Sequence, residues 1–566
     1  MGSQGSNMPN GDHEPPHYDA IVIGGGFGGC YALWKLRKLG FSTHLFEAGT
    51  ALGGVWHWNS YPGARVDSEV PFYQFTIPEV YRDWQWSQRF PGHDEIKAYF
   101  RHVDNVLGLS RDVSYGAIVN GATFDEKTAR WTISTSTGQT ATCRWFLPAT
   151  GSSHKAYEPD FPNLGAYQGR VLHSSSWPTA SEVDFRGKNV AIIGAGATGV
   201  QLVQEISKSA ANLAVYIRNP NIALPMGQRD ISPLEGRAAK GLYRGLFGLA
   251  REAASGIACD AQPLVASQVG HAERQRFWEE LWARGGFAFQ AGNYADVLAD
   301  EGTSRALYDF WAAKVRQRVR DPAKREVVVP DEPPFPFGTK RSSLEQDYYE
   351  CLDRDNVDIV GLKKTPIREF TEGGILTEDG AERKHDIVVM ATGYDNMTGS
   401  LTSMGLRGKD GIDMKERWKD GVWSYLGILA GGCPNMFMIY GPQAPTAFTN
   451  GPIFIECQVD IIADFLVKLR DEHIRTIEPR RGAEESWKDV CQGISDMLLF
   501  RLNDTSWYLG TNIPGKKKEQ LLYLGGIPAY SDACKDGFKD WSNFEVRHEY
   551  GNGVKKLAEK MPQLSV

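Results

Sequence analysis

Two glycine-rich turns, each lying between a short apolar strand and a helix, predict an α/β fold with two Rossmann-like units. Two later apolar strands both end in Ala-Thr-Gly, at residues 149–151 and 391–393, where the chain is expected to leave one unit. Residues 225–333 are rich in helical patterns. The predicted architecture is therefore two nested dinucleotide-binding domains with a helical insertion.

The first turn reads Gly-Gly-Gly-Phe-Gly-Gly from residue 24. Gly24 permits the tight bend, Gly26 lets a pyrophosphate approach the backbone, and Gly29 lets helix and strand pack closely. The next strand ends in Glu47, whose carboxylate can accept hydrogen bonds from ribose hydroxyls. This pattern, at the start of the predicted folded chain, favours an FAD site that also includes Phe27.

The second turn reads Gly-Ala-Gly-Ala-Thr-Gly from residue 194, with Gly194, Gly196 and Gly199 in the same three roles. The strand after it ends in Arg218, where the first unit has an acid. A cation here can pair with a 2′-phosphate, which an acid would repel, so this unit is predicted to bind NADPH. Further NADP contacts are expected from Thr198, Gln201 and Asn219.

The order of these features predicts how the domains are nested along the chain. After a disordered tail (1–16), the FAD domain is expected to comprise two separate segments, residues 17–151 and 391–566. The NADPH domain is expected to lie between them, also as two segments, residues 152–224 and 334–390. The helical insertion (225–333) interrupts the NADPH domain.

Composition excludes several other classes of protein. The net charge of -7 over 566 residues and the absence of a basic tract argue against a nucleic-acid partner. The eight cysteines form no Cys-x-x-Cys pair, which argues against a disulfide reductase and against a metal site. No apolar run reaches the roughly 18 residues of a membrane span, and no secretory signal precedes the first unit. A cytoplasmic monomer is expected.

A string between the two predicted units carries a family resemblance. It runs from Tyr167 through Gly169 and His173 to Trp177, followed by proline. It resembles the fingerprint of type I Baeyer–Villiger monooxygenases, which usually begins with Phe where this chain has Tyr167. His173 is expected to act as a hydrogen-bonded hinge between the domains.

Three further segments resemble the same family, and the resemblance extends from about Tyr18 to Gly526. One follows the first turn and ends in Asp67, and another contains Lys340 and Arg341 just before Ser-Ser-Leu-Glu, which predicts a capped helix start. The third lies late in the chain, at residues 506–516, and contains Trp507. The resemblance implies FAD contacts from Val55, Trp56, Asp67 and Tyr73, and NADP contacts from Arg65, Lys340 and Trp507.

The resemblance also implies the chemistry. NADPH would reduce non-covalently bound FAD, O2 would add to give a C4a-peroxyflavin, and one oxygen atom would be inserted next to a ketone carbonyl to give an ester or lactone. Arg341 is the implied catalytic cation, because a guanidinium stays charged and can stabilise a developing oxyanion. Asp67 would position it.

Two alternatives remain open from the sequence. A sister flavin monooxygenase that oxygenates nitrogen or sulfur shares both turns, and a non-catalytic redox sensor would bind the same nucleotides without turnover. The substrate is expected to be an apolar small-molecule ketone, cyclic or bulky. Its fit would depend on the helical insertion and on residues 444–448, which the sequence does not place in space.

Overall fold

The computed structural model describes residues 14–178 and 183–549. Residues 1–13 of the predicted tail lie outside this range, as do residues 550–566. Residues 14–16 have no regular secondary structure, but the Pro16 carbonyl accepts a hydrogen bond from the Thr142 amide at 2.9 Å. This contact joins the end of the predicted tail to the first sheet.

Among the described residues, the first sheet has seven strands in the order β17-β4-β5-β6-β1-β2-β3. The bounds are β1 His17–Ile23, β2 Thr43–Phe46, β3 Val113–Ser114, β4 Val119–Asp125, β5 Arg130–Thr135, β6 Thr140–Pro148 and β17 Leu406–Arg407. β1 lies between parallel partners β2 and β6, and its residues Ala20, Ile21 and Val22 are fully buried. Burial on both faces explains why this strand is a continuous apolar run.

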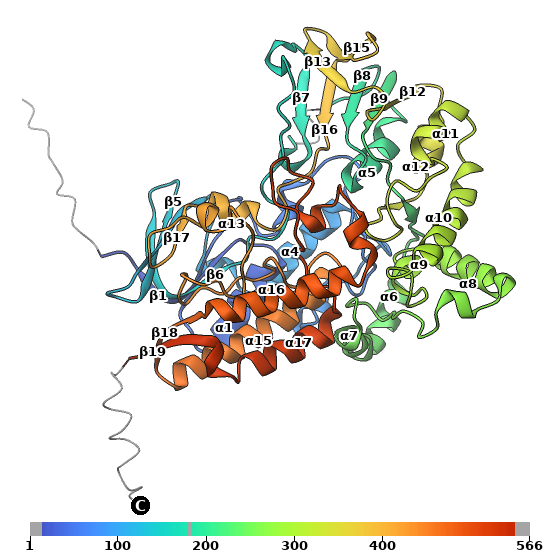
Figure 1. The fold of residues 1–566 in the computed structure, drawn as a ribbon. Coiled ribbons are helices and arrows are strands. Elements are labelled where there is room, and N and C mark those ends of the chain that lie inside the picture. The colour runs from blue at the N-terminus through green and yellow to red at the C-terminus, as the bar shows by residue number, and fades with distance from the viewer. Residues whose placement is uncertain (1–13, 179–182, 550–566) are drawn as a thin grey trace, which may run out of the picture.

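The second sheet is wholly parallel, with the order β12-β9-β8-β16-β7 in the described residues. The bounds are β7 Arg170–His173, β8 Asn189–Ile193, β9 Asn212–Ile217, β12 Val357–Gly361 and β16 Ile387–Met390. β16 lies between β7 and β8, so Met390 is paired with His173 on one side and Ile193 on the other. Figure 1 shows this sheet standing above the body that contains the first sheet. The two parallel βαβ units agree with the predicted α/β class.

Residues 225–333 contain the helices that lie on the right of Figure 1. Their bounds are α6 Pro233–Ala239, α7 Tyr243–Glu252, α8 His271–Arg284, α9 Ala288–Ala291, α10 Glu301–Arg316 and α11 Pro322–Val328. Asp300 and Asp321 cap α10 and α11, since each carboxylate accepts backbone N–H groups of the first helical turn. The Asp321-Pro322 pair therefore separates α10 from α11 and starts the second of them.

The predicted helix start at Ser342–Glu345 is wrong. Residues Leu344–Glu345 form the short strand β11, which pairs with β10 (Leu224–Pro225), and helix α12 begins only at Tyr348 (Tyr348–Leu352). The Glu345 carboxylate binds the guanidinium of Arg318 through two hydrogen bonds of 2.7 and 3.0 Å. The same carboxylate accepts the Tyr348 amide at 3.0 Å, at the start of α12, so it does not complete a capping box with Ser342.

The C-terminal region, in which the sequence offered no motif beyond Gly526, covers the first unit. It contains α15 Gly451–Asp471, α16 Arg481–Asp496, α17 Gly526–Gly537 and the hairpin of β18 Ile474–Pro479 with β19 Phe544–His548. These helices share one core cluster with α1 (Phe27–Lys38) and α4 (His93–Leu107). None of the helices in the described ranges is both long and apolar enough to cross a membrane.

Other elements complete the described chain. They are the antiparallel strands β13 Ile367–Thr371, β14 Gly374–Thr377 and β15 Glu382–Lys384, and the helices α2 Val55–Trp58, α3 Pro78–Tyr81, α5 Ala197–Ile206, α13 Gly399–Ser403 and α14 Met414–Arg417.

A buried ionic cluster joins the helical insertion to the first unit. Glu456 of α15 is fully buried and accepts hydrogen bonds from the Thr76 amide at 2.7 Å and from the Arg251 guanidinium of α7 at 2.7 Å. Asp460, one turn later, binds Arg251 at 3.2 Å and Lys35 of α1 at 2.8 Å. Burial raises the pKa of Glu456, an effect that Arg251 and Thr76 oppose. The cluster thus stabilises three helices and one loop together.

We predict that Glu456→Ala lowers the apparent Tm by several degrees, because removing one partner of a buried ion pair costs about 3–5 kcal/mol. Thermal unfolding followed by circular dichroism measures the change. The control is Glu485→Ala, which removes an exposed pair with Arg481 at 3.1 Å and should cost less than about 1 kcal/mol. Equal decreases in Tm for the two variants would show that the ionic cluster around Glu456 adds no more stability than an exposed ion pair.

Candidate functional site

The first glycine turn has the geometry of a phosphate cradle at the carboxyl end of β1. Gly24 has a φ of +101°, and an added Cβ would lie 2.8 Å from the Ala149 carbonyl oxygen. A Cβ on Gly29 would lie 1.8 Å from the Gly24 oxygen, so only glycine permits this approach of helix to strand. Gly26 faces Gly54, and a Cβ there would be 3.4 Å from the Gly54 Cα.

Glu47 lies at the predicted position after β2, but its carboxylate already binds the turn. It accepts hydrogen bonds from the Gly25 amide at 2.5 Å and the Gly49 amide at 2.6 Å. Burial raises its pKa, and these two hydrogen bonds oppose that rise. Because a carboxylate has about four acceptor positions, Glu47 can hold the loop and still accept a ribose hydroxyl.

The predicted flavin-side aromatics form a contiguous group. Trp56 donates its indole N–H to the Tyr73 hydroxyl at 3.0 Å, and the two rings meet edge to face. Phe27 packs against Tyr73 and is buried, so its ring belongs to the core and only its backbone lies at the turn. Val55, at the start of α2, is 39% exposed and lies outside this core.

The second glycine turn repeats the first. Gly194 has a φ of +118°, and a Cβ on it would lie 2.3 Å from the Ala391 carbonyl oxygen. A Cβ on Gly199 would lie 2.2 Å from the Gly194 oxygen, whereas one on Gly196 would meet no atom within 4 Å. The open space at Gly196 is what a pyrophosphate needs at the start of α5.

Three cations gather beside the second cradle. Arg218 directly follows β9 and is exposed, and Lys363 lies on the turn that follows the adjacent strand β12. Lys340 donates to the Thr505 hydroxyl at 3.2 Å. Burial, together with the charges of Arg218 and Lys363, lowers the pKa of Lys340 to about 8. Within the described residues none of the three cations pairs with an acid, which is the arrangement expected of an anion site.

Asn219 is half-buried directly after Arg218. Sequence reasoning missed Lys363, because its position depends on the pairing of β12 with β9 rather than on a motif.

Arg341 and Asp67 form an ion pair between distant segments of the chain. The guanidinium donates through Nε and Nη2 to one oxygen of Asp67, at 3.0 and 2.7 Å, and through Nη1 to the Ala447 carbonyl at 2.7 Å. It also lies over the ring of Phe287, 5.2 Å from the centroid. Burial alone would lower the pKa of Arg341, but the negative charge of Asp67 outweighs that effect and raises the pKa. Three of the five N–H donors are used within the described residues, which leaves two for a ligand.

The loop that carries Asp67 is bonded to the second unit. The Arg65 guanidinium donates to the Phe90 carbonyl at 2.7 Å, and the Arg65 carbonyl accepts from the Gln201 amide at 3.0 Å. The Gln201 oxygen in turn accepts from the Tyr61 hydroxyl at 2.9 Å. The Thr198 hydroxyl lies 3.4 Å from that of Tyr61.

The fingerprint string borders β16. Tyr167 donates its hydroxyl to the His385 carbonyl at 2.9 Å, so its oxygen, absent from a phenylalanine, has a partner. A Cβ on Gly169 would lie 2.8 Å from the Asp386 carbonyl oxygen. His173 contacts the Thr392 hydroxyl at 3.3 Å, and burial lowers its pKa, so it is neutral at neutral pH.

Trp507 lies half-buried on a segment that is bonded to the Lys340–Arg341 loop. The Asn503 side chain donates to the Thr339 carbonyl at 3.3 Å, and the Thr505 hydroxyl accepts from Lys340. These contacts bring the predicted late motif to the second cradle, although Trp507 itself contacts the Tyr508 ring.

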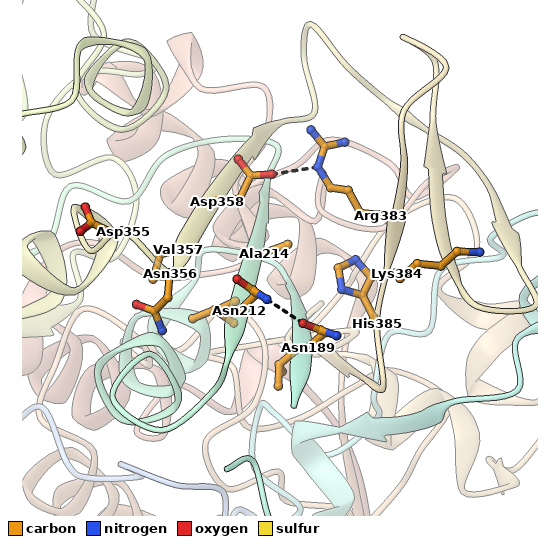
Figure 2. A pocket seen from close by; sticks show the side chains of 12 residues that line it. Asn189, Asn212, Ala214, Asp355, Asn356, Val357, Asp358, Arg383, Lys384 and His385 are labelled. Carbon is orange, nitrogen blue, oxygen red and sulfur yellow. Dashed lines mark hydrogen bonds and ion pairs between the residues drawn. The ribbon is translucent and has the colours of Figure 1, made fainter. Parts of the chain in front are cut away.

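A cavity of about 510 Å³ lies elsewhere, at the opposite end of the second sheet. Figure 2 shows Asn189 bonded to Asn212 and Asp358 bonded to Arg383 in its wall. These residues lie at the amino ends of β8, β9 and β12 or on β15, whereas nucleotides bind at the carboxyl ends of parallel strands. This cavity is therefore separate from the predicted site.

Comparison with known proteins identifies the family. FAD-binding monooxygenase acrE of Aspergillus aculeatus is 41% identical over 540 residues, which are 95% of this chain and 91% of that protein. Cyclopentanone 1,2-monooxygenase of Comamonas sp. is 39% identical over 528 residues, 93% of this chain and 96% of that protein. This chain belongs to the Baeyer–Villiger-type flavin monooxygenases.

Other matches include a monooxygenase named for a different reaction, a solved structure and a domain family. Phenazine N-monooxygenase PhzNO1 of Lysobacter antibioticus is 37% identical over 539 residues, 93% of this chain and 98% of that protein. A closed crystal structure of cyclohexanone monooxygenase superposes with a TM-score of 0.90 at 33% identity, covering 94% of this chain and 100% of that one. Residues 18–240 match the family described as pyridine nucleotide-disulphide oxidoreductase. The eight cysteines are nevertheless free thiols here.

We predict that two glycine substitutions in the second cradle of this Baeyer–Villiger-type enzyme affect different properties, one the stability and the other NADPH binding. Gly199→Ala should lower the apparent Tm, because its Cβ collides with the Gly194 oxygen and overpacking costs about 1–3 kcal/mol. Gly196→Ala should leave the Tm unchanged but weaken NADPH binding, because its methyl group enters the space open to the pyrophosphate. Thermal unfolding and NADPH titration measure the two effects. A large loss of stability in Gly196→Ala would contradict the assigned geometry.

Proposed function

We propose that this protein uses FAD, NADPH and O2 to insert one oxygen atom next to the carbonyl of a small-molecule ketone, giving an ester or lactone. The observation that carries the proposal is the guanidinium of Arg341, held by Asp67 and the Ala447 carbonyl with two N–H donors left for a ligand. The active unit is taken to be the monomer, because both cradles and this pair come from one chain. The cytoplasm is the proposed location, since the eight free thiols suit a reducing compartment.

The residues at each cradle fit the two nucleotides. For FAD, the proposed contacts are Gly24, Gly26, Phe27, Gly29, Glu47, Val55, Trp56, Asp67 and Tyr73. For NADP, they are Arg65, Gly194, Gly196, Thr198, Gly199, Gln201, Arg218, Asn219, Lys340, Lys363 and Trp507. The cluster of Arg218, Lys340 and Lys363, without an acidic partner in the described chain, supports a 2′-phosphate and hence NADPH over NADH.

Bound FAD and NADPH would supply the redox chemistry with O2, and the protein would supply position and charge. Arg341 keeps its proton at any pH the enzyme meets, so its remaining donors can stabilise negative charge that develops on oxygen. Asp67 and the Ala447 carbonyl fix the plane of the guanidinium from two sides. A donor fixed before the reaction needs no reorganisation during it.

The surroundings of Arg341 favour an apolar ketone, cyclic or bulky. Phe287 of the helical insertion lies against the guanidinium of Arg341, and Tyr440 and Tyr508 lie close enough to affect its pKa. Residues 444–448 lie beside the same group through the Ala447 carbonyl. Aromatic walls around one fixed cation suit a ligand with a single polar oxygen and an apolar body.

Oxygenation of nitrogen or sulfur is the second candidate, because one relative is named as a phenazine N-monooxygenase. A mixed panel of linear, monocyclic, polycyclic and aromatic ketones with one thioether, supplied with NADPH and 18O2, separates the candidates. An ester or lactone carrying one 18O supports the proposal. Sulfoxide or hydrogen peroxide without any ester would favour the second candidate, and no oxygen uptake at all would favour a redox sensor.

We predict that Arg341→Ala keeps FAD and its reduction by NADPH but lowers ester formation by about 10²–10³-fold or more, as for loss of a fixed oxyanion donor. Ester yield and flavin absorbance measure the two effects. Arg383→Ala is the control, because Arg383 also pairs with an aspartate at 2.8 Å but at the remote cavity. Ester formation by Arg341→Ala near the unsubstituted level would refute the catalytic role.

We predict that NADPH binding weakens as the pH rises above 8, whereas NADH binding stays constant. Lys340 has a lowered pKa of about 8 in the free protein, and a bound 2′-phosphate raises it. NADPH binding therefore takes up a proton above pH 8, and its affinity falls by up to about tenfold per pH unit. Lys340→Met should remove this slope, and Lys364→Met, at an exposed lysine that binds Glu326, should not. A Kd for NADPH independent of pH from 7 to 10 would exclude this role.

A further inference from the structure

Tyr61 lies where the two nucleotide units meet, on the loop that leads from α2 to Asp67. Its side chain is 8% exposed, and its hydroxyl donates to Gln201 at 2.9 Å and lies 3.4 Å from the Thr198 hydroxyl. Thr198 and Gln201 belong to α5, which begins directly after Gly196. One side chain of the first unit therefore contacts the first turns of the helix that forms the second cradle.

The same helix holds the Tyr61 loop at two more points. The Gln201 side-chain nitrogen donates to the Arg65 carbonyl at 3.0 Å. Gly63, with a φ of +78°, lies so close to α5 that an added Cβ would be 2.9 Å from the Gln201 backbone oxygen. Because one amide bonds to Tyr61 and to Arg65, a displacement of α5 acts on the loop through both bonds. Asp67, two residues later, transmits the position of the loop to Arg341.

The fingerprint tryptophan supports the ring of Tyr61. Trp177 is 8% exposed and meets Tyr61 edge to face, with 6.3 Å between the ring centroids. On its other side it lies 6.3 Å from Phe185. The ring of Tyr61 is therefore packed from the linker side while its hydroxyl is bonded to α5.

We propose that Tyr61 is a positioning residue that couples occupancy of the second cradle to the placement of Asp67 and Arg341. The inference rests on the proposed function, in which NADP occupies that cradle and Arg341 contacts the reacting atoms. A nucleotide bound at the start of α5 takes up the N–H groups of its first turn. Tyr61 and Gln201 then carry the resulting position of α5 to the loop that holds Asp67.

The test compares Tyr61→Phe, Gln201→Glu and the double variant, each loaded with FAD and NADPH. Tyr61→Phe removes the hydroxyl and keeps the ring, and Gln201→Glu keeps an acceptor for Tyr61 but loses the donor to Arg65. In Tyr61→Phe, flavin reduction at saturating NADPH should stay near the unsubstituted rate. The ester formed per NADPH oxidised should fall about fivefold, the scale of one lost buried hydrogen bond. The ester yield of the double variant should fall no further than that of the more impaired single variant, because both changes interrupt the same link between α5 and the Asp67 loop.

The matched control is Tyr308→Phe, which removes another buried hydroxyl, bonded to the Pro330 carbonyl at 2.6 Å in the helical insertion. It should leave the ester yield per NADPH unchanged. An unchanged yield in Tyr61→Phe, an equal loss in Tyr308→Phe, or additive losses in the double variant would overturn the proposal.

A binding measurement separates this inference from the proposed function. If the unsubstituted enzyme forms no ester from any ketone, the proposed function fails, and NADP+ titration then tests the coupling alone. NADP+ should change the flavin absorbance of the unsubstituted protein. Tyr61→Phe should show a smaller absorbance change, while its Kd for NADP+, measured by calorimetry, should stay within about threefold of the Kd of the unsubstituted protein. An equal absorbance change in both proteins would overturn the coupling.

Discussion

The pairing of Arg341 with Asp67 joins side chains 274 positions apart, one carried by the loop after the first cradle and one by the loop after the helical insertion. A guanidinium among aromatic rings is costly to bury unless an opposite charge and further acceptors satisfy it. Asp67 and the Ala447 carbonyl meet that need from two directions. The packing that sets the distance between the two units therefore also sets the position of this cation.

The nested chain path makes that distance well defined. β16 lies between β7 and β8, and the chain then returns to the first unit beside the segment that left it. The two connections bond to each other: the Tyr157 amide donates to the Gly393 carbonyl at 2.9 Å, and the Asp395 amide donates to the Lys155 carbonyl at 2.9 Å. His173 contacts the hydroxyl of Thr392 at the end of this connection. Two connections that are hydrogen-bonded to each other resist twisting better than two separate linkers. These hydrogen bonds therefore restrict rotation of one unit relative to the other.

Local constraints explain what the sequence predicted well. An added Cβ at Gly24, Gly29, Gly194 or Gly199 would lie only 1.8–2.8 Å from a neighbouring atom, so these positions require glycine. Both cradles can therefore be recognised from a few residues. The Asp67–Arg341 pair followed only from family resemblance, because no local rule links positions so far apart. The predicted helix start at Ser342 was wrong because Leu344 and Glu345 pair with β10, and Glu345 binds Arg318 in the turn after α10. Lys363 and the C-terminal helices depend on strand pairing and on packing, which single-sequence patterns do not contain.

The acceptor that Ala447 offers to Arg341 is a main-chain carbonyl, so it does not depend on which side chain occupies position 447 or its neighbours. Ala444 and Thr446 are fully buried, so within residues 444–448 only the half-buried Phe448 can change in size with little effect on the core while the cation keeps its anchor. On the proposed function, a substitution at Phe448 would change the ligands that fit beside Arg341 and leave its main-chain anchor in place.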